Sequence, residues 1–179
     1  MQINRLLVVT NIQKTLDFLV QHPGHQFLAS EIQKAIKISK GGVNLSLREL
    51  VKGKLIKREK KGRLFLYSVD HTQPVIKQLK VLKNVELLNP LVAKIKGLSE
   101  KIILFGSCAR GEDVPESDID LFVLTNSPKE VEEILKRHKL SRGLQLIVRT
   151  PLAFVEMEKK EPVFFEEISR GITLWESKE

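Results

Sequence analysis

The sequence has little cysteine and no long apolar run, and each shortage excludes a class of protein. One cysteine in 179 residues, Cys108, excludes an internal disulfide and a zinc site built from several cysteines. No apolar run reaches the roughly 18 to 20 residues that span a membrane, and the N-terminus lacks a clear signal-peptide cleavage site. The GxxxxGK and GxGxxG phosphate-binding motifs are missing, and the four histidines have no metal-ligand spacing. We therefore expect a cytoplasmic protein that does not insert into a membrane.

What the sequence does have is an excess of positive charge at one end. Residues 1–70 hold 13 Lys and Arg against 5 Asp and Glu, which is the whole net charge of +8, whereas residues 71–179 hold 17 of each kind. Such asymmetry indicates two functional units, the first of which faces a polyanion. The simpler alternative is a basic surface that only aids solubility.

The basic end has the pattern of a small DNA-binding domain. Apolar spacing predicts three helices between residues 12 and 52, followed by two strands, Leu55–Arg58 and Leu64–Val69, around a basic turn. From Ala29 to Val69 this order resembles the winged helix-turn-helix domains of bacterial and archaeal transcription regulators. The resemblance implies that the third helix enters the major groove of double-stranded DNA and that the hairpin contacts the backbone or the minor groove.

The residues expected to contact DNA lie on the third helix and the hairpin. Basic side chains there can neutralise phosphates and release counterions, Asn44 and Arg48 can read base edges, and glycines allow close approach. The full set is Lys40, Gly41, Gly42, Asn44, Arg48, Arg58, Lys60, Lys61 and Arg63. A protein-protein module with a solvated basic helix is the alternative, and the charge asymmetry favours nucleic acid.

The chain divides into three predicted segments. We expect a winged helix-turn-helix domain over 1–70, a connecting helix over 71–90 and a second domain over 91–179. The connecting helix begins near Pro74 and ends near Asn89-Pro90, and a second short helix follows from Leu91 to Lys96. These helices either cover the next domain's sheet or form a homodimer contact, because winged helices often read symmetric sites as a pair.

The second domain opens with a motif that indicates chemistry. "KIILF" predicts a buried strand, and Gly106-Ser107 then turns into a short helical segment whose backbone N–H groups can bind an anion. A second strand, "DIDLFVL", follows. Because strand side chains alternate, Asp118 and Asp120 should point to the same side. Two like charges this close favour a divalent cation, and Mg²⁺ prefers such oxygen ligands.

Together these residues spell G-S-x-x-R-G-x6-D-x-D, from Gly106 to Asp120. This motif resembles the minimal nucleotidyltransferases of the DNA polymerase beta superfamily, over about residues 91 to 175. The resemblance implies an α/β (α+β) fold with a mixed sheet and transfer of a nucleoside monophosphate from an NTP to an acceptor hydroxyl. It also implies that Asp118 and Asp120 are catalytic and hold Mg²⁺, and that the nucleotide is bound by Gly106, Ser107, Arg110 and Ser117.

One position departs from that family. A third carboxylate normally lies on a later strand, and the matching segment "LQLIVRT" has Gln145 instead. An amide is neither a charged metal ligand nor a base near neutral pH, so Glu112 or Glu156 would have to substitute. The alternatives are a DNA-binding regulator whose second domain binds nucleotide with weak or no catalysis, and an antitoxin-like protein with a small helical toxin-like partner.

Overall fold

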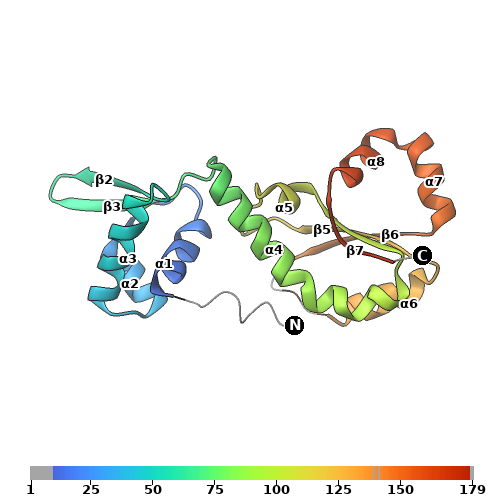
Figure 1. Cartoon of the computed structure of the whole chain (residues 1–179), viewed down its shortest axis with the longest axis horizontal. Coiled ribbons are helices and arrows are strands. Elements are labelled where there is room, and N and C mark those ends of the chain that lie inside the picture. Colours follow the sequence, from blue (N-terminus) through green and yellow to red (C-terminus); the bar gives the residue numbers. More distant parts are fainter. Residues whose placement is uncertain (1–9, 139, 141, 178–179) are drawn as a thin grey trace. The chain divides into compact units, whose positions relative to one another are not determined.

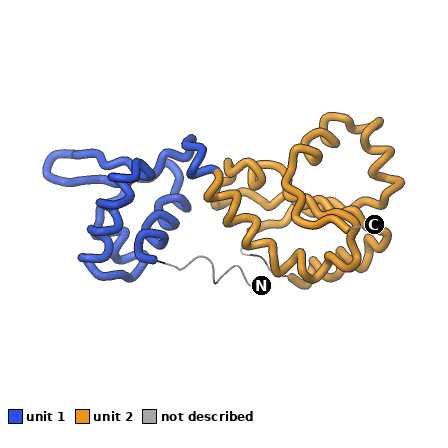
Figure 2. The backbone as a smooth tube through the Cα atoms, viewed as in Figure 1, with its two compact units in different colours: residues 1–77 blue, residues 78–179 orange. Residues whose placement is uncertain are grey.

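The computed structural model describes residues 10–138, 140 and 142–177, and divides the chain into two compact units, Met1–Lys77 and Gln78–Glu179 (Figure 2). The division falls inside the segment for which a connecting helix was predicted. Each unit is described by itself below. Across the described ranges, every helix is too short or too polar to cross a membrane.

Before α4 begins, the described residues of unit 1 form three helices and a small antiparallel sheet (Figure 1). The elements are α1 (Asn11–Val20), β1 (Phe27–Leu28), α2 (Ala29–Ile36), α3 (Lys40–Lys52), β2 (Lys57–Lys61) and β3 (Leu64–Ser68). The strand order is β1-β3-β2, with both pairs antiparallel. Short β1 was not predicted. The first hairpin strand begins two residues later than predicted, because Lys54 turns the chain at a φ of 58° and Ile56 enters the core.

Local signals in the sequence set the ends of these helices. Thr10 and Gln13 form a capping box at the start of α1, and the Ser39 hydroxyl accepts from the Gly42 N–H at the start of α3. The apolar positions of the three helices then meet in one core, with Leu19, Ile32, Val43, Leu47 and Leu50 at most 2% exposed.

Helix α4 (Pro74–Ile95) runs through Pro90, where the sequence predicted a break between two helices. Proline removes one backbone hydrogen bond and usually kinks or ends a helix. Here Leu88, Leu91 and Ile95 on both sides of Pro90 are completely buried in the same core. Packing along one face therefore holds the helix together across the proline.

Unit 2 is built on a four-stranded mixed sheet of order β6-β5-β4-β7. Its strands are β4 (Lys101–Phe105), β5 (Ile119–Leu124), β6 (Leu144–Arg149) and β7 (Ile172–Glu176). β4 pairs antiparallel with both β5 and β7, and β5 pairs parallel with β6. The helices of this unit after α4 are η2 (Lys96–Leu98), α5 (Gly106–Arg110), α6 (Pro128–Lys136), α7 (Pro151–Lys160) and α8 (Pro162–Ser169). The mixed sheet expected for this unit is confirmed.

The two faces of the sheet carry different layers. Ile119, Leu121 and Val123 of β5 pack into a core with α4 and α6, whereas Phe122 packs with residues of α7 and α8 on the opposite face. Because side chains alternate along β5, Asp120 lies on the Phe122 face, which α7 and α8 cover. The polar start of β5 thus lies beside an apolar layer.

Candidate functional site

The two aspartates lie where β5 begins. Asp118 immediately precedes the strand, and Asp120 is its second residue. Asp120 is level with Phe105 at the end of β4 on one side and with Gln145 of β6 on the other. The turn at Gly106 starts directly after Phe105. The end of β4 and the start of β5 therefore bring Asp120 and the Gly-Ser turn together.

Gly106 is a position where only glycine fits. Its φ is 67°, in the left-handed region, and a Cβ at this position would lie 2.1 Å from Oδ2 of Asp120. The Asp120 carboxylate therefore rests against the bare backbone of the turn. This contact explains why glycine opens the motif: the turn and the carboxylate share the same space.

Gly143 has the same relation to the first aspartate. A Cβ on Gly143 would lie 1.9 Å from Oδ1 of Asp118, and the Gly143 carbonyl accepts from the N–H of Ile119 at 2.8 Å. The segment leading into β6 therefore forms a backbone shelf beneath the Asp118 side chain. Sequence reasoning missed this residue, because only strand pairing places residue 143 beside residue 118.

The electrostatics of the pair favour a cation. Burial first, and then the charges of Glu167 and Asp118, raise the pKa of Asp120, and Arg110 partly offsets them. Among the described residues, no hydrogen bond or salt bridge neutralises either carboxylate side chain. Two close carboxylates with no bonded counter-charge fit a divalent ion such as Mg²⁺, which completes its coordination with water and phosphate oxygens.

A third acid does not complete the pair. No group of three His, Cys, Asp or Glu side chains in the described ranges is arranged to hold a metal ion. Gln145 lies level with Asp120 on the neighbouring strand, and its side chain is exposed. Glu156 instead forms an ion pair with Lys160 at 2.7 Å, and Glu112 forms one with Arg110 at 3.0 Å.

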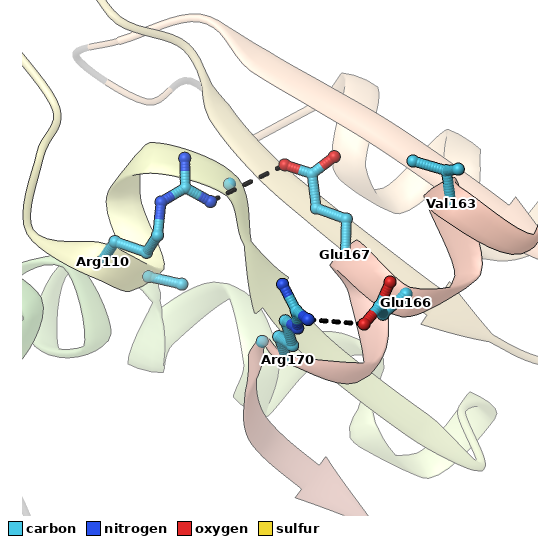
Figure 3. Close-up of a pocket in the computed structure, with 8 residues that line it drawn as sticks. Arg110, Val163, Glu166, Glu167 and Arg170 are labelled. Carbon is cyan, nitrogen blue, oxygen red and sulfur yellow. Dashed lines mark hydrogen bonds and ion pairs between the residues drawn. The ribbon is translucent and has the colours of Figure 1, made fainter.

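A pocket of about 390 Å³ adjoins the Gly106 turn, between α5 and α8 (Figure 3). Arg110 points from α5 toward Glu167 of α8, with its Nη1 atom 3.7 Å from Oε1, while Glu166 and Arg170 pair with each other nearby. Glu167 was not predicted as a site residue, since nothing in the helix that carries it distinguishes it from its neighbours. The pocket therefore has both acidic and basic side chains beside the Gly106 turn.

The two predicted serines have different surroundings. Ser107 is half-buried in the first turn of α5. The Ser117 hydroxyl accepts from the N–H of Val114 at 2.9 Å and so closes the loop before β5. Ser107 therefore lies within the Gly-Ser turn itself, and Ser117 also has a local structural contact.

Some of the predicted DNA-contacting residues gather in unit 1. Asn44 and Arg48 of α3 line a pocket of about 310 Å³ together with Arg58 and Tyr67 of the hairpin. Arg58 also lies over the Phe65 ring, 4.7 Å from its centroid. Lys60 lies on the same face of β2 as Arg58, because side chains two residues apart on a strand point to the same side. Both residues are exposed.

The other predicted residues are placed differently. A Cβ on Gly42 would lie 3.0 Å from Asn11 of α1, whereas Gly41 faces open space. The glycine requirement at Gly42 therefore includes packing within the unit. Lys61 donates to Gln26 at 2.9 Å. Lys40 and Arg63 are exposed at the start of α3 and in the hairpin turn.

Comparison with known proteins agrees with the motif. Residues 85–172 match the nucleotidyltransferase domain family. A Methanocaldococcus jannaschii protein named a putative protein adenylyltransferase is 51% identical over 39 residues, which make up 22% of this chain and 39% of the relative. A solved structure described as a putative nucleotidyltransferase from Sulfolobus solfataricus is 16% identical, with 60% of this chain and 93% of that chain covered at a TM-score of 0.38. The matched residues include the whole motif from Gly106 to Asp120, so this part of the chain is similar to nucleotidyltransferase domains.

Proposed function

We propose that this nucleotidyltransferase domain transfers a nucleoside monophosphate from an NTP to an acceptor hydroxyl in a Mg²⁺-dependent reaction. The observation that carries the proposal is the Asp118–Asp120 pair, which has no bonded counter-charge among the described residues. Asp120 rests against the Gly106 turn, and Asp118 rests against Gly143. Mg²⁺ held there would bind phosphate oxygens and stabilise charge on the reacting groups.

The chain's own residues have separate roles in this proposal. Asp118 and Asp120 hold the ion and catalyse the transfer. Ser107 and the backbone at Gly106 bind the NTP phosphates, and Ser117 closes the loop beside them. Arg110 supplies positive charge at the edge of the pocket, where Glu112 and Glu167 hold its guanidinium between them. A phosphate would compete with these carboxylates for Arg110.

The acceptor that we propose is a protein hydroxyl, and the transferred group is AMP. This proposal rests on the name of the Methanocaldococcus jannaschii relative, with which a 39-residue segment is shared. Incubation with ATP labelled at the α-phosphate and a set of protein acceptors tests it. Label should appear in protein with wild type and not with Asp118→Ala or Asp120→Ala. Label in a nucleic acid or a small molecule instead would overturn the protein acceptor alone.

We further propose that unit 1 is a winged helix-turn-helix domain that binds double-stranded DNA. Three helices followed by an antiparallel hairpin support this proposal, as does the pocket where Asn44 and Arg48 meet Arg58. Exposed basic side chains on α3 and β2 match the regular negative charge of the DNA backbone. Failure to bind duplex DNA at low salt, where counterion release favours binding most, would refute this role.

A second candidate function is a DNA-binding regulator that binds nucleotide without efficient transfer. The exposed Gln145 beside Asp120 favours it, because an amide cannot accept the proton of the attacking hydroxyl. One experiment distinguishes the two proposed functions. Tight binding of Mg²⁺ and a non-hydrolysable ATP analogue, with no label transferred from ATP, would select the regulator.

A further inference from the structure

Arg142 lies beside the candidate site but outside its predicted residues, and its guanidinium makes an unusual number of contacts. Nε and Nη2 donate to the carbonyl oxygen of Ser117 at 2.9 and 2.7 Å, and Nη1 donates to Oδ2 of Asp113 at 2.8 Å. Weaker contacts reach Oδ1 of Asn84 and Sγ of Cys108, both at 3.4 Å. The Arg142 side chain is only 15% exposed.

The carbonyl that Arg142 holds belongs to the peptide bond that enters Asp118. The carbonyl of Asp118 itself accepts a weak bond from Sγ of Cys108 at 3.4 Å, and the next N–H, of Ile119, donates to Gly143. Asp118 is therefore held by backbone bonds before, at and after its own position. Gly143, which lies under the Asp118 carboxylate, directly follows Arg142 in the chain.

Buried partners fix the guanidinium in turn. Asp113 is 6% exposed and also contacts Lys80 of α4, whose Nζ is 3.6 Å from Oδ1 and donates to the Asp113 carbonyl. Asn84, one turn further along α4, donates to Oδ1 of Asp113 and to the Cys108 carbonyl. A buried charge cluster of this kind is costly to assemble and costly to break, so it holds its members in one geometry.

We propose that Arg142 is a positioning residue that fixes the Asp118 carboxylate for metal binding, by holding the Ser117 carbonyl and the Gly143 shelf together. The inference rests on the proposed function, because the position of Asp118 matters to a cation only if the pair binds one. Lysine cannot replace arginine here, since a single ammonium group does not reproduce the planar fork that reaches Ser117 and Asp113 together.

The test is the affinity of the full chain for Mn²⁺, measured from the free-ion electron paramagnetic resonance signal, for wild type, Arg142→Lys and Asp118→Ala. Partners that orient a metal ligand change metal affinity by about 10- to 100-fold, so we expect R142K to bind Mn²⁺ about tenfold more weakly. Arg149→Lys is the matched control. Its guanidinium also donates to a backbone carbonyl, of Val148, at the other end of β6, and the control should bind like wild type.

A purely structural role would act differently. Thermal unfolding followed by circular dichroism establishes that each variant is folded, and guanidinium ions added to Arg142→Ala should restore part of its Mn²⁺ affinity. If R142K does not fold, Asp113→Asn, which leaves Arg142 in place without its buried partner, should also bind Mn²⁺ more weakly. Wild-type affinity in folded R142K, or in D113N if R142K is unfolded, overturns the inference alone. Mn²⁺ binding that Asp118→Ala leaves intact overturns the proposed function.

Discussion

Single residues around the two aspartates meet more than one structural requirement, and Gly106 is the clearest case. It needs a left-handed backbone, and it must leave room for the Asp120 carboxylate. We predict that Gly106→Ala loses about 1 to 2 kcal/mol of unfolding free energy from backbone strain and about 100-fold in transfer rate from displacement of the carboxylate. Urea unfolding and rates of label transfer check both numbers.

Gly143 separates these two effects. It is exposed and lacks a left-handed φ, yet a Cβ there meets the Asp118 carboxylate. Gly143→Ala should therefore change the free energy of unfolding by less than about 0.5 kcal/mol while lowering the transfer rate about tenfold or more. The matched control is Gly97→Ala, because a Cβ on Gly97 meets nothing. An unchanged rate in Gly143→Ala would show that the shelf does not fix Asp118.

The raised pKa of Asp120 makes a prediction about pH. Its ordinary value is 3.8, and burial with Glu167 and Asp118 raises it in the folded chain. Without metal, the folded state then binds a proton more tightly than the unfolded state, so this residue's contribution to stability is greatest below about pH 4 and is lost as pH rises through the higher folded value. Urea unfolding in EDTA between pH 4 and 7 should show a decline that Asp120→Asn reduces.

The raised pKa of Asp120 also makes a prediction about metal binding, which acid should weaken. A protonated carboxyl cannot hold a cation, so acidification should release Mn²⁺ at a higher pH than an ordinary aspartate would allow. The dissociation constant for Mn²⁺, measured at each pH, should begin to rise as the pH falls while still above the ordinary aspartate value. The same dissociation constants in Asp120→Asn and wild type across this range would mean that Asp120 is not a ligand.

At the scale of secondary-structure elements, the hairpin of unit 1 makes a prediction about salt. Each phosphate contact contributes about 0.9 to the slope of log affinity against log salt. Lys60→Ala should lower this slope by about one for duplex DNA. Lys57→Ala is the control with the same charge change, because Lys57 pairs with Asp70 at 2.7 Å on the alternate face of β2. Equal slopes for both variants would argue for net charge instead of a defined contact.

The elements also show what a sequence can and cannot predict. The strand before Gly106, the alternation that predicts Asp118 and Asp120 on one side and the place of Gln145 on β6 all follow from short-range pattern. In the sheet register, Asp120 pairs with Phe105 and with Gln145. The break predicted at Pro90 was wrong, because buried leucines on both sides outweigh the lost hydrogen bond. Local propensity could not include that packing.

At the scale of the whole molecule, the residues that sequence reasoning missed are those that act across long chain separations. Arg142 meets Asp113 across 29 residues and Asn84 across 58, and Glu167 reaches Arg110 from α8. None of them stands in a motif, and only the sheet and its covering helices bring them together. The division of charge between the units, in contrast, was visible in composition alone.

The central claim is that Asp118 and Asp120 bind a divalent ion and support nucleotidyl transfer, and label transfer from ATP tests it most directly. The full chain, given ATP labelled at the α-phosphate, Mg²⁺ and protein acceptors, should release pyrophosphate and label a protein. Asp118→Ala and Asp120→Ala should abolish both products, and EDTA should do the same to wild type. Transfer that is unchanged in both variants, or that continues in EDTA, would contradict the account.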